Sequence, residues 1–170
     1  YRSLFSDADW EVLLDFASVD GKLYTLPNVA ANDPTTWIYR KDAWDKAGIT
    51  EFPRTMDELY EALKTLKAAY PDSVGIGVRQ GVNDMINGFR QAFRNPHNSS
   101  TQGFWLDPDI GDQLIWNFSS EKHREMLKFI AKLYKEKLVE QEFATITKEQ
   151  WVAKRLSGKV LIDFQWASHT

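Results

Sequence analysis

The sequence predicts an α/β or α+β protein, because segments with strand character alternate with segments of helical spacing along the whole chain. Two observations carry this prediction. Capping boxes, in which Thr is followed three residues later by Glu or Gln, introduce helices at Thr55 and Thr147. The run at residues 159–164 is almost continuously apolar, which is typical of a strand buried on both faces of a sheet.

The expected helices share a capping residue at the start and apolar side chains that recur every three or four residues. Gly48 and Gly158 supply the left-handed conformation that ends two of them. The buried face of the longest helix is expected to carry Leu127, Ile130, Tyr134 and Leu138. The helices are expected to begin at or beside Ser6, Asp42, Thr55, Asn83 or Asp84, Ser119 or Ser120, and Thr147.

Strands are expected where β-branched and aromatic residues cluster between turn residues. Asp20 and Gly21 form a turn before the first strand, and the glycines of the third indicate close backbone approach. The polar, turn-rich segment 96–117 is expected to be an irregular insertion or lid. The expected strands are residues 22–26, 36–39, 74–78 and 159–164.

Composition and charge narrow the possible classes of protein. The chain has 170 residues, 43% of them hydrophobic, and no apolar run approaches the roughly 18 residues that span a membrane. With 21 Lys and Arg against 24 Asp and Glu the net charge is −3, which argues against nucleic acid as a partner. Cysteine is absent, which excludes disulfides, thiolate metal sites and cysteine nucleophiles.

Aromatic residues are unusually frequent. The 7 Trp, 6 Tyr and 10 Phe make up 14% of the chain. They indicate either a large aromatic core or rings that line a ligand site, where flat apolar faces suit stacking. Both interpretations stay open for Trp37 and Trp166.

No pattern in the sequence indicates catalysis or a bound cofactor. The three histidines lack metal-ligand spacing, and Asp107, Asp109 and Asp112 lack the distal Glu of a calcium loop. Neither a nucleophile elbow nor a glycine-rich phosphate loop occurs. Acidic residues such as Glu136 and Glu140 are expected on a solvated face beside lysines. We therefore expect no catalytic residue, no metal and no cofactor.

Polar and aromatic side chains lie at the ends of the predicted strands. Trp37 flanks the entry to the second strand, Asn83 and Asp84 start a helix after the third, and Gln165 and Trp166 follow the last. In open α/β sheets, ligands lie outside the carboxyl ends of strands. Rings for sugar faces, together with amides and carboxylates for hydroxyls, favour a carbohydrate site there.

Short segments in a fixed order resemble those of the family 1 extracellular solute-binding proteins. These are the substrate receptors of bacterial ABC importers, and maltose-binding protein is the best-known member. The segments include Asp-Gly-Lys-Leu-Tyr-Thr-Leu-Pro at 20–27, Pro-Arg-Thr-Met-Asp-Glu-Leu at 53–59, Leu-Tyr-Lys-Glu-Lys-Leu-Val at 133–139 and Ser-Gly-Lys-Val at 157–160. The ordered set is more specific than any one motif.

The resemblance implies a periplasmic-binding-protein-like lobe of type II, with a mixed sheet flanked by helices. It implies two lobes that close on a ligand. It assigns residues 1–27 to the end of the first lobe and the hinge-crossing segment, and residues 28–170 to an incomplete second lobe. Both ends of the chain look cut, so we expect a truncated receptor whose bared surface favours self-association.

The resemblance also implies a function, namely capture of a carbohydrate or oligosaccharide in a cleft between two lobes for a bacterial ABC importer. Its partners would be the saccharide and the permease subunits, at the outer face of the cell membrane with a lipid anchor, or in the periplasm. By position, Asp33 matches a ligand-contacting acidic residue, Asn83 and Asp84 fall near a second contact region, and Trp166 matches a sugar-stacking Trp. The calcium motif of some longer members is not found.

The residues alone leave two other functions open. A glycan-active enzyme needs two carboxylates roughly 5 to 9 Å apart across one cleft. If the chain is instead a free-standing, lectin-like module, we expect a complete domain that binds carbohydrate by itself.

Overall fold

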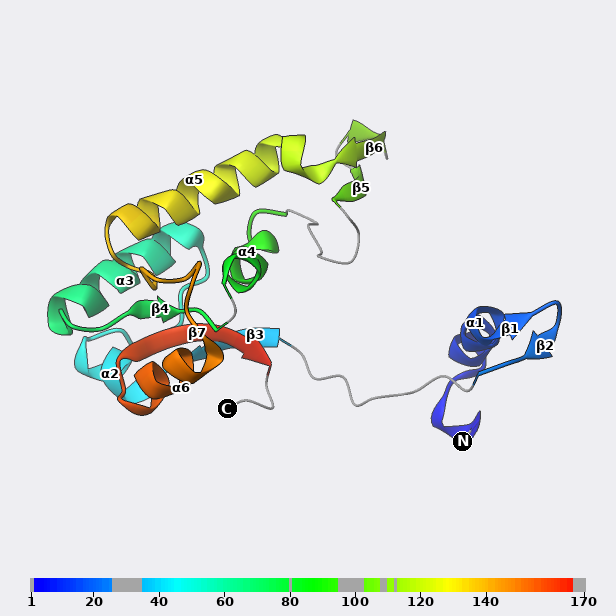
Figure 1. Cartoon of the computed structure of the whole chain (residues 1–170), viewed down its shortest axis with the longest axis horizontal. Helices are drawn as coiled ribbons and strands as arrows, with labels where there is room; N and C mark the ends of the chain where they lie inside the picture. Colours follow the sequence, from blue (N-terminus) through cyan, green and yellow to red (C-terminus); the bar gives the residue numbers. More distant parts are fainter. Residues whose placement is uncertain are drawn as a thin grey trace. The chain divides into compact units, whose positions relative to one another are not determined.

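The computed structural model describes residues 2–25, 35–79, 81–94, 103–107, 110–111 and 113–166. The chain forms two compact units, Tyr1–Pro34 and Thr35–Thr170, each described by itself below (Figure 1). Strands and helices alternate as the sequence predicts. No helix in the described ranges is both long and apolar enough to cross a membrane.

The first unit consists of a short helix and a hairpin. The 3-10 turn η1 (Arg2–Leu4) precedes α1 (Asp7–Ala17), and the hydroxyl of Ser6 caps α1 by accepting a hydrogen bond from the backbone N–H of Asp9 at 3.2 Å. Strands β1 (Ser18–Val19) and β2 (Lys22–Leu23) pair antiparallel. The strand expected at 22–26 is shorter in the described part, and its partner β1 was not predicted. Positive φ at Asp20 and Gly21 makes the tight turn that joins them.

A three-stranded mixed sheet forms the centre of the second unit. Its strands are β3 (Thr35–Tyr39), β7 (Val160–Trp166) and β4 (Gly75–Gly77), in the order β3-β7-β4. β7 pairs antiparallel with β3 and parallel with β4. The four residues Val160 to Asp163 are buried, so the prediction of a central strand covered on both faces is confirmed.

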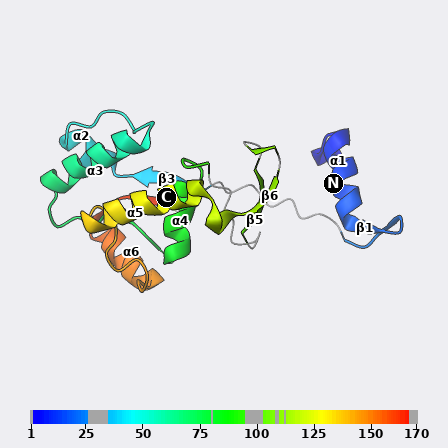
Figure 2. The ribbon, with the colours of Figure 1, turned by 90° about the horizontal axis from the view of Figure 1, so that it is seen from above.

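Helices cover both faces of this sheet in the described part of the chain. The turned view in Figure 2 shows α2 and α3 on one side of the strands and α4 and α6 on the other. The capping boxes predicted at Thr55 and Thr147 are both present. The helices are α2 (Lys41–Lys46), α3 (Met56–Ala69), α4 (Val82–Arg90), α5 (Glu121–Lys135) and α6 (Lys148–Leu156).

The hydrophobic core is built from the inward faces of these elements. The inward face of α3 carries Leu59, Leu63 and Leu66, which are at most 2% exposed. Further buried members of the core include Trp44, Ile76, Phe89, Met126, Leu133, Leu161 and Ile162.

The predicted buried face of the longest helix is confirmed for Ile130 and Leu138, which are buried, and wrong for the other two residues. Leu127 and Tyr134 are 43% and 41% exposed, whereas Met126 and Leu133 are fully buried. Two apolar sets with the same three-and-four spacing overlap on this helix, so the spacing does not choose between them. Leu138 lies beyond the end of α5, where its backbone N–H donates to the carbonyl of Leu133 at 2.9 Å.

Part of the segment expected to be irregular forms a hairpin. Strands β5 (Phe104–Asp107) and β6 (Gln113–Trp116) pair antiparallel, and a 3-10 turn, η3 (Asn117–Ser119), leads into α5, which Ser120 caps. Residues 104–106 and 114–116 are short apolar runs, so they lack the alternation of apolar and polar residues that predicts a strand. The exposed apolar side chains, here termed the hairpin patch, are Phe104, Leu114, Trp116 and Phe118.

Glu140 is buried, which corrects its expected place on a solvated face. It is 3% exposed, and its carboxylate lies 2.9 Å from the ammonium of Lys154 on α6. Burial alone lowers the pKa of Lys154, but hydrogen bonds to Glu140 and Glu142 outweigh it and leave the pKa above the ordinary 10.5. The pair therefore fastens α6 to the turn that follows α5.

Replacing Lys154 is expected to destabilise the chain strongly. Lys154→Met leaves the buried Glu140 carboxylate without its cation, which costs about 3 to 5 kcal/mol of unfolding free energy at pH 7. Lys64→Met is the control, because its pair with Glu61 is solvent-exposed and contributes less than about 1 kcal/mol. Urea unfolding of both variants measures the difference.

The pH dependence provides a check on the same pair. A raised lysine pKa stabilises the fold below the unfolded pKa, and that contribution disappears as pH rises through the folded pKa. The wild type should therefore lose more stability above about pH 10.5 than Lys154→Met does. The buried Lys154–Glu140 pair would be contradicted if the wild type and Lys154→Met lost equal stability above that pH. Equal destabilisation by Lys154→Met and Lys64→Met at pH 7 would also contradict it.

Substitution of Gly75 tests the close backbone approach that the sequence predicts in β4. It has φ of 71°, and a Cβ there would lie 2.3 Å from the carbonyl oxygen of Leu138. Gly75→Ala is expected to cost about 3 kcal/mol or more, from strain and overlap together. Gly48→Ala is the control, because Gly48 also has positive φ but has open space around it, and should cost about 1 to 2 kcal/mol. Equal losses in urea unfolding would show that the contact with Leu138 is unimportant.

Candidate functional site

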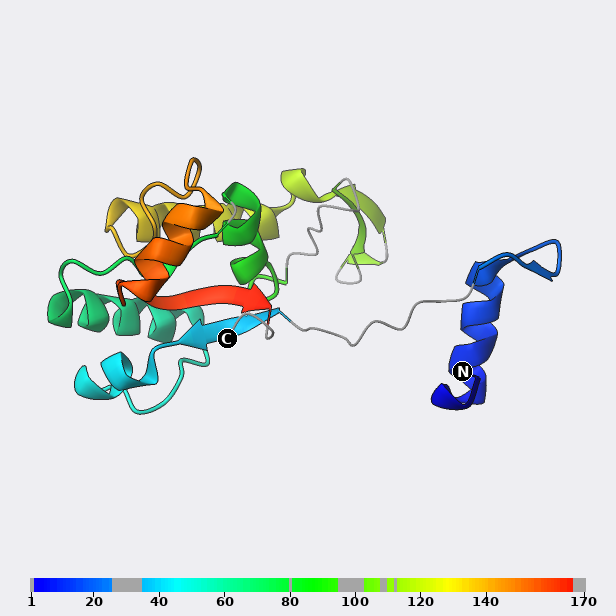
Figure 3. The same ribbon diagram turned by 60° about the horizontal axis from the view of Figure 1, so that its bottom comes forward.

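A pocket of about 290 Å³ lies at the edge of the sheet where β7 ends and β3 begins. Figure 3 shows these two strand ends side by side, with α4 next to them. The lining of the pocket combines aromatic rings with amide, carboxylate, guanidinium and hydroxyl groups. The described lining residues are Thr35, Asn83, Asp84, Asn87, Arg90, Phe164, Gln165 and Trp166.

Strand pairing explains why residues so distant in sequence meet here. β4 and β7 run parallel, so the segments that follow them leave the sheet at the same edge. After β4 the chain turns at Gly81 into α4, and β7 ends at Trp166. The antiparallel partner β3 begins at this edge, where Thr35 is the register partner of Trp166.

Helix α4 begins two or three residues earlier than the sequence indicates. The prediction that Asn83 or Asp84 caps it is wrong, because the N-cap is Gly81 and no side chain caps the helix. Gly81 has φ 74° and ψ −153°, a region that in practice only glycine adopts. Asn83 and Asp84 consequently lie within the first turn of α4.

The polar face of α4 forms one wall of the pocket. Asn83, Asn87 and Arg90 follow one another at spacings of four and three residues, so they share a helix face. The apolar face of the same helix carries Met85 and Phe89, both buried in the core. The amphipathic pattern of α4 therefore determines which side chains reach the pocket.

The end of β7 supplies the other wall. Trp166 is 41% exposed, so part of its indole is open to solvent, whereas Gln165 is only 3% exposed. Successive strand residues point to opposite faces, which accounts for this difference between neighbours. Both residues line the same pocket, which lies at the end of the strand.

Trp37 is partly buried, packs against the core and is not among the described residues that line this pocket. Its ring makes edge-to-face contacts with Phe89 and Phe164, at centroid distances of 5.5 and 5.4 Å. Trp37 therefore packs against Phe164, which lines the pocket. Asp33, the other residue expected from the loop before β3, lies outside the described residues.

Four lining residues were not identified from the sequence: Thr35, Asn87, Arg90 and Phe164. Asn87 and Arg90 could have been found, because they lie four and seven residues after Asn83 and hence on its helix face. Thr35 becomes a neighbour of Trp166 only through strand register. No local signal in the sequence specifies that register.

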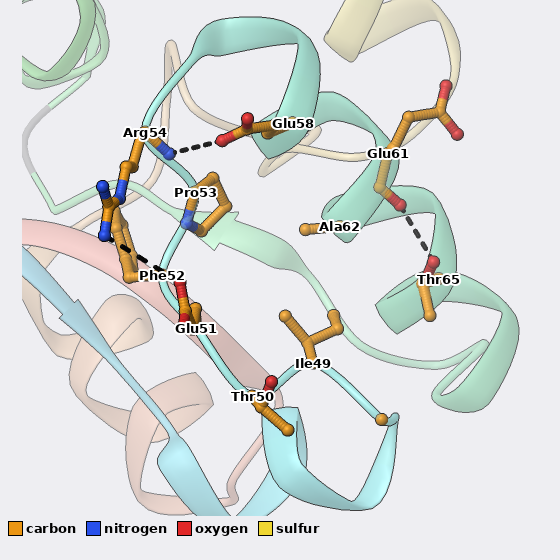
Figure 4. Close-up of a pocket in the computed structure, with 11 residues that line it drawn as sticks. Ile49, Thr50, Glu51, Phe52, Pro53, Arg54, Glu58, Glu61, Ala62 and Thr65 are labelled. Atoms are coloured by element: carbon orange, nitrogen blue, oxygen red, sulfur yellow. Dashed lines mark hydrogen bonds and ion pairs between the residues drawn. The ribbon is translucent and has the colours of Figure 1, made fainter.

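A larger hollow of about 590 Å³ lies between the end of α2 and α3. Figure 4 shows its lining, in which Glu58 accepts a hydrogen bond from the backbone N–H of Arg54 at 2.7 Å. The ring of Phe52 is stacked on Trp44, with planes 12° apart, so one of its faces is already covered. This hollow is a poorer stacking site than the pocket at Trp166.

The chemistry of the pocket at Trp166 suits recognition of a polyhydroxylated ligand. Amides both donate and accept hydrogen bonds, and Asp84 and Arg90 add an acceptor and a donor for hydroxyl groups. The exposed indole offers an apolar face for a sugar ring. Asp84 is the single carboxylate among the described lining residues, and the described chain contains no group of three His, Cys, Asp or Glu that could hold a metal.

Known proteins resemble this chain in sequence. Lipoprotein LipO of Bacillus subtilis is 28% identical over 170 residues, covering 96% of this chain and 33% of LipO. The diacetylchitobiose-binding protein DasA of Streptomyces coelicolor is 42% identical over 59 residues, which is 34% of this chain and 13% of DasA. The chain thus spans a third or less of these relatives.

A solved structure shares the fold. The ABC-transporter substrate-binding protein FusA of S. pneumoniae, in complex with kestose, superposes with a TM-score of 0.65 over 99% of this chain and 36% of FusA, at 20% identity. This likeness confirms the expected solute-binding-protein fold. The family model for bacterial extracellular solute-binding proteins matches residues 4–167. The chain therefore belongs to the bacterial extracellular solute-binding protein family.

Proposed function

We propose that this chain is part of the substrate-binding component of a bacterial ABC importer and contributes one wall of a saccharide site. The observation that carries the proposal is the pocket in which the exposed ring of Trp166 meets the amides of Asn83, Asn87 and Gln165. Membership of the solute-binding family and the names of DasA and FusA support a sugar ligand.

The proposal extends to the organisation of the receptor. Residues 1–27 end the first lobe and cross the hinge, and residues 28–170 belong to the second lobe. Permease subunits in the membrane are the partners that receive the ligand. The receptor works at the outer face of the cell membrane, held by a lipid anchor, or in the periplasm; the family and the lipoprotein LipO support this location.

The protein binds its ligand without changing it. Glycoside hydrolysis generally needs a pair of carboxylates, whereas the described lining of the pocket carries Asp84 alone. A lectin-like module would bind fully by itself. A single wall of a two-lobed site binds weakly, because the contacts that the other lobe makes are missing.

Saccharide binding by the 170-residue chain is expected in the millimolar range, which corresponds to about 4 kcal/mol. Titration with kestose and diacetylchitobiose, followed by NMR of ¹⁵N-labelled protein, should shift the side-chain amides of Asn83, Asn87 and Gln165. No shift with either sugar up to tens of millimolar contradicts the proposed site. A micromolar dissociation constant contradicts the proposal that this chain supplies only one wall of the site, and it favours the lectin-like alternative.

Trp166→Ala is expected to weaken this binding by about 1 to 3 kcal/mol, because the stacking surface is lost. The unfolding free energy should change by less than about 1 kcal/mol, because the ring is 41% exposed. Trp116→Ala removes a comparably exposed indole, 52% exposed on the hairpin, and should leave affinity unchanged. If both variants bind like the wild type, Trp166 is not a ligand contact.

Self-association of the chain is expected through the hairpin patch. Its members are between 42% and 66% exposed, and contiguous exposed apolar surface favours association. Leu114→Glu should lower the apparent mass measured by light scattering at high protein concentration. Leu156→Glu should not, because Leu156, although 84% exposed, lies on α6 outside the hairpin patch. A monodisperse monomer at every concentration contradicts this expectation.

A further inference from the structure

Arg79 lies next to Trp166, the exposed tryptophan of the pocket. It follows β4 by two residues and so leaves the sheet at the edge where β7 ends. Its guanidinium carbon is 5.6 Å from the ring centroid of Trp166 and 5.9 Å from that of Trp151 on α6. Arg79 is not among the described residues that line the pocket.

The stack continues from Trp151 to a buried carboxylate. The guanidinium carbon of Arg155, one turn further along α6, is 5.3 Å from the Trp151 centroid. The Nε of Arg155 lies 3.6 Å from a carboxylate oxygen of Asp163, which is 2% exposed. Asp163 and Trp166 are both on β7, so the chain of contacts starts and ends on the same strand.

Cation–π contact with the two indole rings is the interaction that the structure shows for Arg79. Its buried Nε has no hydrogen-bond acceptor among the described residues. A planar guanidinium stacks on aromatic faces, and the attraction grows as the cation is desolvated. Trp151 is 5% exposed, so the inner side of this arrangement is shielded from water.

We infer that Arg79 is a positioning residue, whose stacking between Trp151 and Trp166 holds the Trp166 indole ready to receive a saccharide. This inference rests on the proposed function. One face of the indole is fixed by Arg79, while the ring remains open enough to stack on a ligand. Because the ring is ordered in advance, less side-chain entropy is lost on binding.

The test compares Arg79→Met, which removes the cation, with Arg79→Lys, which keeps the charge but loses the planar stack. In the ligand-free 170-residue chain, ¹⁵N relaxation of the indole N–H of Trp166 reports its order, with Trp166→Phe assigning the signal. Arg79→Met should lower that order and weaken binding of kestose or diacetylchitobiose roughly three- to tenfold. Arg79→Lys should give a smaller change in both.

Lys64→Met is the matched control. It also removes a cation from an aromatic ring, 5.1 Å from the centroid of Tyr60 on α3, away from the pocket. It should alter neither the Trp166 signal nor saccharide affinity. Thermal unfolding of each variant separates loss of positioning from loss of folding, and Arg79→Lys decides the question if Arg79→Met does not fold.

Two results overturn the inference. Unchanged order of the Trp166 indole in Arg79→Met, or in Arg79→Lys if only that variant folds, shows that Arg79 does not hold the ring. Weaker binding with an unchanged indole signal shows instead that Arg79 contacts the ligand directly. Absence of saccharide binding by the wild type refutes the proposed function, whereas the indole measurement without ligand still tests the stack.

Discussion

The parallel pairing of β4 with β7 is the constraint on which the second unit depends. It places the segments after both strands at one edge of the sheet, so that Arg79 and α4 lie beside Trp166 although Trp166 is far from them in sequence. On its other side, β4 approaches the segment after α5 closely, and a side chain at Gly75 would overlap the carbonyl of Leu138.

Buried charge holds α6 against the elements around it. Lys154 of α6 reaches the buried Glu140, and Arg155 of the same helix reaches the buried Asp163 of β7. A buried carboxylate is costly unless a cation accompanies it, so both contacts constrain where α6 can lie. α6 carries Trp151, and its position therefore determines whether Arg79 has an aromatic surface to stack on.

The high aromatic content serves two different purposes. Trp44 and Phe89 are buried in the core, and Trp37 packs against it. Trp37 contacts Phe89 edge to face, and Trp44 is stacked on Phe52. Trp166 has the same chemistry but ends a strand, and it is accordingly left partly exposed beside polar groups. Position at a strand end, more than residue type, separates a ring that packs in the core from one that can stack on a ligand.

The sequence by itself determined the elements whose signals are local. The capping boxes at Thr55 and Thr147, the central apolar strand and the closeness of Asn83, Asp84, Gln165 and Trp166 to strand ends can all be read from neighbouring residues. Tertiary structure decided what depends on partners outside the local segment: the face that α5 buries, the burial of Glu140, the packing of Trp37 against the core, and the entry of Thr35 and Phe164 into the pocket. Capping and periodicity act within a few residues, whereas strand register joins residues more than a hundred positions apart, such as Thr35 and Trp166. No local pattern specifies which partner such a residue will find.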